Sequence, residues 1–406
     1  MISLWQLIKR KRKLLITIVL VLMVGSILLA ASGLLFLEIK RNQTLTLPDP
    51  TGPYAIGRVS YDWTDQSRPE TYTNQPGAKR ELLIWIWYPA RHSANAKTLP
   101  YFPPAWSALW EQDRGTTNDQ LFQNFASIQT HTLDRPPLAS SSTKYPVLVF
   151  SPGMGLMPGN YTTLIEDLVS HGYIVVGINP TYTAPIVFPD GRTTQALPAA
   201  KISESSDPKA INDSMNQTID VWTKDSRFVL NQLTLLNSSQ DMLAGHLDLQ
   251  HIGLFGHSFG GATAAEVCHL DTRCKAGIDL DGSQAGDVVQ TGLKQPFMFV
   301  SHDDPGCSTQ TCRDFIQTAR TILRPVPRGQ GYILTIKDTQ HFNFTDYAAI
   351  FSPLRFVNAL GSIDGQRGLQ ITRDYVRAFF DTYLKQNRSP LLQGQSSAYP
   401  EVQFDK

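Results

Sequence analysis

A serine set among glycines is the strongest chemical signal in this chain. Residues 251–266 read HIGLFGHSFGGATAAE, so Ser258 follows a short apolar run and precedes helix-forming residues. Glycine is favoured where the backbone takes angles that other residues resist, or where two segments approach closely. A strand, a sharp glycine-rich turn and a helix in this order form a nucleophile elbow, which exposes one serine hydroxyl above a sheet. Ser258 is therefore the predicted nucleophile.

A serine hydroxyl needs a base that removes its proton and an acid that orients the base. His302 and His341 both follow Ser258 and stand at the ends of predicted strands. His341 comes near the close of the last predicted strand, which makes it the predicted base. His257, directly beside the serine, is expected to point away from the elbow and to have a structural role.

Two aspartates compete for the role of the acid. Asp281 ends the segment AGIDLDG and Asp304 ends FMFVSHDD. In most enzymes built on this elbow the acid follows the later strand, which favours Asp304. Asp279 lies two residues before Asp281 and shares its face if the strand extends that far. His302, Asp303 and Asp304 are interpreted as a loop rather than a metal site, and we expect no metal or organic cofactor.

Apolar strands that alternate with helices indicate an α/β fold with a mostly parallel sheet covered on both faces. Long polar stretches at 104–144, with a short helix around 118–128, and at 181–215 are expected to be irregular. We expect one domain over 56–390 and a surface tail over 391–406. The strands are predicted at 80–90, 145–153, 172–180, 251–256, 274–282, 295–304 and 331–341, and the helices near 160–170, 219–236, 259–265, 312–322 and 371–385.

The N-terminus carries a different signal. Residues 9–13 are all basic, and residues 14–37 are uncharged and mostly apolar. A helix over 14–37 would extend about 36 Å, enough to span a bilayer core with some tilt. We predict an uncleaved signal anchor with residues 1–13 in the cytoplasm, a linker at 38–55 and the domain outside. The alternative is a signal peptide cut within LLAAS, around Ala31, which would release a secreted protein.

Charge and cysteine content narrow the possible partners and compartment. The formal net charge is +1, which gives no electrostatic reason to expect nucleic acid, and no obligate protein partner is evident. The four cysteines form two close pairs, Cys268 with Cys274 and Cys307 with Cys312. In an oxidising compartment we predict a disulfide within each pair, because the spacing does not match that of zinc ligands.

Several segments resemble the secreted and type II platelet-activating factor acetylhydrolases. The stretch GHSFGGATAAEVCHLDTRCKAGIDLDG at 256–282 is similar to the nucleophile region of that family. HFNFTDY at 341–347 resembles its His-x-Asn-Phe-x-Asp stretch, and VLVFSPGMG and SHGYIVVGINP resemble its oxyanion strand and the next strand. The resemblance covers roughly 55–385, with the middle loop poorly matched. It implies an α/β-hydrolase fold and catalysis of ester hydrolysis.

The resemblance also implies roles for single residues. The family acid falls on Asp281, and the oxyanion donors fall on the backbone N–H groups of Met154 and Phe259. Pro152 stands where many relatives have a histidine, which leaves the donor untouched but alters the pocket. Together with the anchor predicted from residues 9–37, this gives a membrane-anchored, extracytoplasmic serine esterase that uses Ser258, His341 and Asp281. Its implied substrates are carboxylic esters, among them short or oxidised acyl chains of phospholipids.

Two other functions remain open from the sequence. Cutinase-like enzymes share the Gly-His-Ser-x-Gly-Gly pattern, so a broad carboxylesterase or polyester hydrolase is the first alternative. In that case Asp304 rather than Asp281 is the expected acid. A catalytically idle hydrolase fold that serves as a membrane-tethered binding protein is the second alternative, although the intact Ser, His and Asp candidates argue against it.

Overall fold

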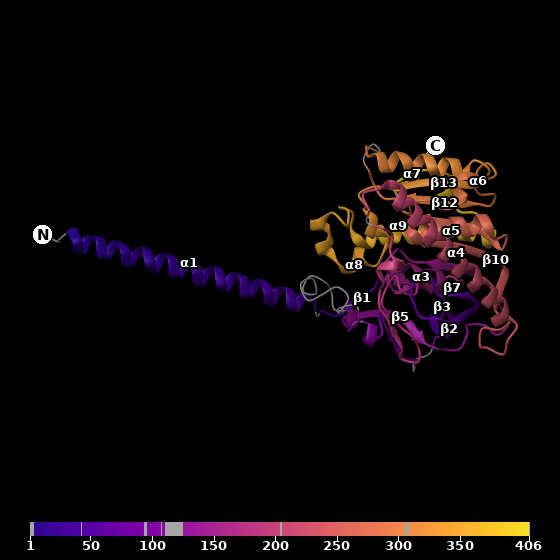
Figure 1. Ribbon diagram of the computed structural model, residues 1–406, viewed down its shortest axis with the longest axis horizontal. Helices are drawn as coiled ribbons and strands as arrows, with labels where there is room; N and C mark the ends of the chain where they lie inside the picture. Colours follow the sequence, from indigo (N-terminus) through magenta and orange to yellow (C-terminus); the bar gives the residue numbers. More distant parts are fainter. Residues whose placement is uncertain are drawn as a thin grey trace.

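The computed structural model describes residues 4–41, 43–92, 96–106, 108–109, 125–203, 205–304 and 308–405 (Figure 1). A 12-stranded sheet forms the centre, in the order β1-β5-β2-β3-β7-β6-β10-β11-β12-β13-β14, and β4 pairs with β5. The strands are β1 (Leu45–Thr46), β2 (Ala55–Pro69), β3 (Lys79–Ala90), β4 (Thr98–Pro100), β5 (Ile128–Asp134), β6 (Tyr145–Ser151), β7 (Ile174–Asn179), β10 (Leu247–His257), β11 (Cys274–Leu280), β12 (Phe297–Ser301), β13 (Gly331–Ile336) and β14 (Val402–Phe404), with β8 (Ile186–Val187) and β9 (Thr193–Thr194) in a separate hairpin.

Helices cover both faces of this sheet. On one face, α3 and α9 contribute to a core with residues such as Leu168 and Phe380. On the other face, α4, α5, α6 and α7 contribute to a second core, with residues such as Leu233 and Ile322. The helices are α1 (Leu4–Arg41), α3 (Thr162–Ser170), α4 (Pro208–Asn237), α5 (Phe259–Leu270), α6 (Val288–Thr291), α7 (Gln310–Leu323), α8 (Tyr347–Ile350) and α9 (Gly365–Leu384).

The central strands run parallel from β7 through β6, β10, β11 and β12 to β13. Their sequences are continuous apolar runs because helices bury both faces, and this confirms the α/β-hydrolase architecture expected from the sequence. The parallel arrangement also brings the carboxyl ends of β10, β11, β12 and β13 to one edge of the sheet. Ser258, Asp281, His302 and His341 follow these four strands in order.

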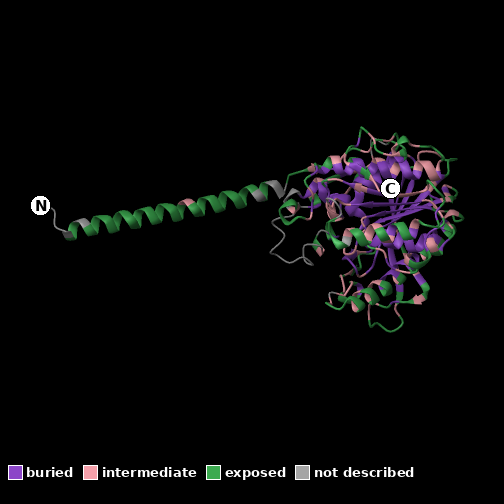
Figure 2. Cartoon of the chain, turned by 90° about the horizontal axis from the view of Figure 1, so that it is seen from above, coloured by how far each residue is buried: buried purple, intermediate pink, exposed green. Residues whose placement is uncertain are grey.

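The N-terminal helix α1 projects away from the rest of the chain and is exposed along its length (Figures 1 and 2). Its segment Ile8–Phe36 is long and apolar enough to cross a membrane, and none of it is buried. The helix is longer than the predicted span at 14–37, since it also contains the basic residues 9–13. An exposed apolar helix of this kind fits both an anchor and a signal sequence.

The structure differs from the sequence prediction in several segments. The stretch 181–215, expected to be irregular, contains the hairpin of β8 and β9, and the predicted linker at 38–55 contains β1. Strand β2 lies where no element was predicted, and β5 lies within the stretch predicted to be irregular. Helix α4 begins at Pro208 instead of 219, since Asp207 caps it by accepting a hydrogen bond from the Lys209 N–H and proline suits the first turn. The sheet extends beyond residue 390, because β14 pairs antiparallel with β13. Most of the helix predicted around 118–128 lies outside the described residues.

Candidate active site

The turn between β10 and α5 carries Ser258 in a backbone conformation that few residues adopt. Its φ is 55° and its ψ is −126°, and its N–H donates to the Leu280 carbonyl at 2.8 Å. The glycines around it are required by close packing. A Cβ on Gly260 would collide with the Ser151 carbonyl of β6, and one on Gly261 would collide with the Asp279 carboxyl. Small neighbours therefore let the serine stand at the sharp turn that the sequence predicted.

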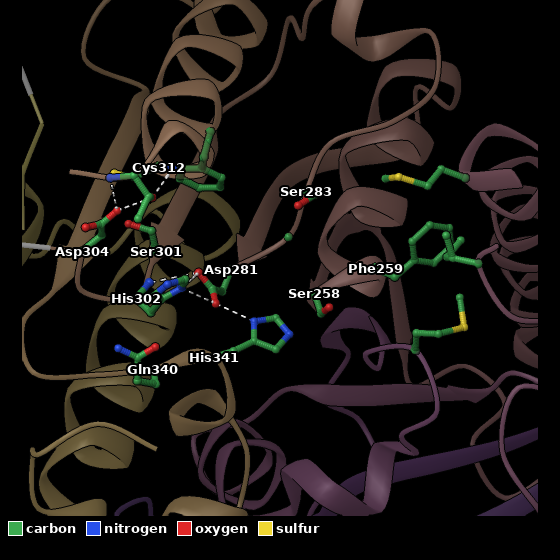
Figure 3. A pocket seen from close by; sticks show the side chains of 16 residues that line it. Ser258, Phe259, Asp281, Ser283, Ser301, His302, Asp304, Cys312, Gln340 and His341 are labelled. Atoms are coloured by element: carbon green, nitrogen blue, oxygen red, sulfur yellow. Dashed lines mark hydrogen bonds and ion pairs between the residues drawn. The ribbon is translucent and has the colours of Figure 1, made fainter. Parts of the chain in front are cut away.

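Asp281 and His341 are joined directly. The Nδ1–H of His341 donates to Oδ2 of Asp281 at 2.6 Å, although the two residues are 60 positions apart (Figure 3). Ser258 lies beside the His341 ring in the same view, and no hydrogen bond joins its hydroxyl to that ring among the described residues. Such contacts are often long in unliganded enzymes. The structure thus brings together the three residues that the sequence singled out.

A second histidine contacts the same carboxylate. The Nδ1 of His302 lies 2.7 Å from Oδ1 of Asp281, and the backbone N–H of His302 donates to the same oxygen at 3.0 Å. Burial raises the pKa of Asp281, but the hydrogen bonds from His302 and His341 outweigh it and hold this pKa well below the ordinary range. Asp281 is therefore ionised. His302 is expected at a strand end from the sequence, but its contact with Asp281 is not.

Asp304 is hydrogen-bonded within its own loop. Its carboxylate accepts hydrogen bonds from Ser308 and Thr309, which lower its pKa to about 2. It thus closes the turn before α7 instead of orienting an imidazole. Asp279 is fully buried behind the elbow, where its carboxyl accepts a hydrogen bond from Gln284 and burial raises its pKa well above the ordinary value. Neither residue has a hydrogen bond to a histidine among the described residues.

His257 lies buried under the elbow, in keeping with the structural role expected for it. Its Nε2 is 3.0 Å from the His341 carbonyl, which can only accept, so Nε2 carries the proton. Burial lowers the pKa of His257 to about 3, so the ring is neutral and its Nδ1 accepts from the Tyr161 hydroxyl at 2.8 Å. That hydroxyl accepts in turn from the Gly153 N–H at 3.0 Å. A directed chain of hydrogen bonds therefore joins the loop after β6 to the loop that carries His341.

Two backbone N–H groups lie at the predicted oxyanion positions. Met154 follows the glycine turn after β6, and Phe259 is the first residue of α5. Neither of these N–H groups has a hydrogen-bond acceptor within the described part of the chain. Phe259 also stands at the positive end of the α5 dipole, where partial negative charge is stabilised. These donors are free to bind an oxygen with developing negative charge.

Ser258 opens into a pocket of about 450 Å³. One wall is apolar and is formed by Met154, Ile202, Met215 and Phe259, which pack in one cluster. The opposite wall is polar, and Figure 3 shows it beyond Asp281 as seen from Ser258. The polar residues of this wall are Ser301, His302, Asp304, Thr309 and Gln340, and Cys312 and Phe315 also line the pocket. The pocket therefore offers an apolar and a polar subsite on either side of the serine.

His257, Asp281 and His341 place possible metal-ligand atoms within 4.8 Å of one another. Both ring nitrogens of His257 are engaged by protein groups, and both oxygens of Asp281 accept from histidines. These atoms are therefore directed at one another in a hydrogen-bond network. The arrangement serves proton transfer at a serine better than it serves ion binding.

One predicted disulfide is present. Cys268 near the end of α5 is bonded to Cys274 at the start of β11, six positions further along the chain. The bond ties the helix that follows the elbow to the strand that precedes Asp281. The second predicted pair, Cys307 with Cys312, involves Cys307, which lies outside the described residues.

A family model and two curated relatives match most of this chain. The family model described as platelet-activating factor acetylhydrolase, isoform II, matches residues 39–181 and 214–396. The chain is 28% identical over 391 residues to a probable 1-alkyl-2-acetylglycerophosphocholine esterase of Arthroderma benhamiae, covering 88% of this chain and 93% of that protein. It is 24% identical over 371 residues to a platelet-activating factor acetylhydrolase of Cavia porcellus, covering 84% of this chain and 78% of that protein.

A solved structure shows the same fold. A ferulic acid esterase from Streptomyces cinnamoneus superposes with a TM-score of 0.74 at 28% sequence identity, covering 89% of this chain and all of that one. The family model does not match the part of this chain between residues 181 and 214. This part contains the hairpin of β8 and β9 and the start of α4. Ile202 of the apolar wall comes from this segment. The part of the chain that departs from the family model therefore reaches the pocket.

Proposed function

This chain belongs to the platelet-activating factor acetylhydrolase isoform II family and is a carboxylic ester hydrolase, and we propose that its catalytic groups are Ser258, His341 and Asp281. The observation that carries the proposal is the 2.6 Å hydrogen bond between His341 and Asp281 beside the elbow serine. Asp304 is the weaker candidate for the acid, because its carboxylate is bonded to Ser308 and Thr309.

In the proposed mechanism, the Ser258 Oγ attacks the ester carbonyl while Nε2 of His341 takes its proton. Asp281 accepts from Nδ1–H of His341, so Nε2 is the free nitrogen, and the carboxylate stabilises the imidazolium that forms. The alcohol leaves with the proton from His341, and an acyl group remains on Ser258. Water then attacks this acyl-enzyme with His341 again as the base, and the carboxylic acid is released.

The N–H groups of Met154 and Phe259 are proposed to bind the oxyanion in both steps. Their support is position: each follows the end of a central strand, and each lines the pocket that holds Ser258. Losing one such donor typically slows an enzyme by about 10²–10³. No metal or organic cofactor enters this mechanism, because the proton transfers and the charge stabilisation are all assigned to protein groups.

For substrates, we propose esters with a short or oxidised acyl chain, including those of phospholipids. The apolar wall beside Phe259 suits a short acyl group, and the polar wall suits a polar alcohol. The names of the two curated relatives point to the same class. The ferulic acid esterase favours a second candidate, a broad carboxylesterase that also accepts aromatic or polyester substrates. A panel of p-nitrophenyl esters of rising chain length, a short-chain phospholipid and methyl ferulate separates the two.

For location, we propose that α1 anchors the enzyme and that the domain lies outside the cytoplasm. The basic residues 9–13 precede the apolar segment, and such residues stay on the cytoplasmic side. The Cys268–Cys274 disulfide fits an oxidising compartment. A secreted form released by cleavage near Ala31 is the alternative.

A fluorophosphonate probe tests the nucleophile and also the idle-binding-protein alternative. We expect the wild-type protein to be labelled and to hydrolyse p-nitrophenyl acetate, and Ser258→Ala to lose both while it remains folded. Ser283→Ala is the matched control, because Ser283 lines the same pocket but follows no elbow (Figure 3). Turnover by purified Ser258→Ala protein would refute the assignment.

A further inference from the structure

The Asp281 carboxylate is shared by two imidazoles. His341 bonds to Oδ2 at 2.6 Å. His302 bonds to Oδ1 through its backbone N–H at 3.0 Å, and its Nδ1 lies 2.7 Å from Oδ1 and 2.8 Å from Oδ2. The proposed triad needs only one of these rings. The His302 ring also lines the pocket, and its side chain is 36% exposed, so it can exchange protons with solvent.

We propose that His302 is a positioning residue for the esterase reaction: it fixes the Asp281 carboxylate toward His341, and its protonation slows the enzyme at acid pH. The inference rests on the proposed roles of Ser258, His341 and Asp281. It adds to them a group that does not touch the reacting atoms and acts through the acid.

The torsions of Asp281 show why its carboxylate needs a positioning residue. Its backbone has a φ of 61°, and its N–H donates to the Val300 carbonyl at 2.7 Å, so the main chain is fixed. The terminal torsion of an aspartate is broad, however, and one hydrogen bond to His341 leaves the carboxylate free to rotate. The backbone N–H of His302 holds Oδ1, and its ring Nδ1 lies against both oxygens, 2.7 Å from Oδ1 and 2.8 Å from Oδ2, so the carboxylate is fixed with Oδ2 toward His341. His302 thereby removes a rotation that would otherwise misalign the base.

During the proposed reaction the Asp281 carboxylate must stabilise positive charge on His341. The hydrogen bond to Asp281 raises the pKa of His302, and the charge of Asp281 adds to this effect. When His302 is protonated, the carboxylate already faces one positive ring, and it then stabilises less well the imidazolium that forms on His341. The other titratable or charged groups that face His302 are Asp303 and Asp304 on its own loop, His341 on the loop after β13, and His257 at the end of β10.

The pH effect has one direction. In the wild-type enzyme, kcat/KM falls as His302 gains its proton. A variant without a titrating group at 302 lacks this loss, so its acid limb begins at lower pH than that of the wild type.

Two substitutions separate the hydrogen bond from the charge. In His302→Asn, the side-chain amide can place an N–H near the position of Nδ1 but does not titrate. In His302→Phe, a ring remains but the side-chain donor is lost. His251→Asn is the matched control, since His251 makes the same kind of contact, Nδ1 to Asp248 Oδ2 at 2.7 Å, before the apolar part of β10 and away from the pocket. Each protein is measured as the full chain with p-nitrophenyl acetate over about pH 4 to 9, with thermal unfolding as the check on folding.

We expect His302→Phe to lower kcat about tenfold with little change in KM, because one hydrogen bond to a charged group is lost while the backbone donor stays. His302→Asn should restore most of that loss near neutral pH. His302→Asn should also lower the pH at the midpoint of the acid limb by about half a unit. This is the order of magnitude expected for the interaction of two partly solvent-screened charges beside one carboxylate. His251→Asn should match the wild type in both respects.

An active wild-type enzyme whose kcat and acid limb are unchanged by both His302 substitutions would overturn the inference and leave the proposed function standing. A change in KM alone would also overturn it, since His302 would then contact substrate. If His302→Phe does not fold, the acid limb of His302→Asn still decides. A wild-type protein with neither turnover nor fluorophosphonate labelling would overturn the proposed function and this inference with it.

Discussion

Asp281→Asn keeps the size and shape of a side chain that accepts hydrogen bonds on both oxygens, and it removes one of the two acceptors. Oδ1 accepts from the backbone N–H of His302, Oδ2 accepts from the ring of His341, and the ring Nδ1 of His302 lies against both oxygens. An amide has one oxygen and one NH₂ group. Its orientation is decided by the backbone N–H of His302, which can only donate and has no other tautomer. The oxygen must stay at the Oδ1 position, so the NH₂ group faces His341.

The expected magnitude follows from that orientation. A donor beside Nδ1 of His341 favours the tautomer with its proton on Nε2, and this tautomer cannot accept the Ser258 proton. In a well-studied protease triad, the same substitution with its geometry kept lowers turnover by about 10⁴. This corresponds to about 5.5 kcal/mol of barrier. We expect a loss of this size for Asp281→Asn, because rotation of the amide cannot relieve it.

Asp304→Asn is the paired control for this measurement. Its carboxylate accepts only from Ser308 and Thr309 in the described structure, so the substitution should cost less than about tenfold in kcat/KM. Both variants are assayed with p-nitrophenyl acetate at one pH, and thermal unfolding checks that each is folded. A large loss for Asp304→Asn with a small loss for Asp281→Asn would refute the reasoning and favour the cutinase-like alternative.

Three further predictions concern other parts of the chain. Gly260→Ala should abolish turnover and lower the melting temperature, because its Cβ would meet the Ser151 carbonyl, which cannot move aside; a stable and active variant in a thermal melt and ester assay would contradict the packing of the elbow. Replacing Cys268 and Cys274 together with alanine should reduce the free energy of unfolding by about 2 kcal/mol, as expected for a loop this short, and denaturant unfolding checks it. If α1 is an uncleaved anchor, the full-length protein should remain with membranes through a carbonate wash, whereas a mature N-terminus near residue 32 would show cleavage.

The parallel core could be predicted because each of its strands is an apolar run bounded by glycine or proline. Strands β6, β7 and β12 read in this way and are buried on both faces. Strand β2 does not, because it is partly exposed and carries many polar residues, so its pairing with β3 is a tertiary outcome. The start of α4 has a local signal in the sequence, because Asp207 followed by Pro208 is a typical helix beginning.

The sequence can identify a site residue only where the pattern that marks it lies within one short segment of the chain. The elbow around Ser258 is local, because strand, glycines and helix stand together in 251–266. The choice between Asp281 and Asp304 is not, since both follow strands and differ only in which side chains reach them across the sheet edge. The same limit hid the contact of His302, which depends on the register of β11 beside β12. An aspartate and a histidine that directly follow two adjacent parallel strands are a sequence pattern that could have indicated this contact.

The chain of hydrogen bonds through Tyr161 and His257 has a consequence for how the site responds to heat. Each link has a donor at one end and an acceptor at the other, so the chain closes for only one tautomer and one charge state of His257. The glycine turn beside Met154 and the loop of His341 are thereby ordered before any ester arrives, and their conformational entropy is lost during folding instead of during binding. Ester turnover should therefore stay close to Arrhenius up to the temperature at which this buried chain breaks, and fall abruptly there.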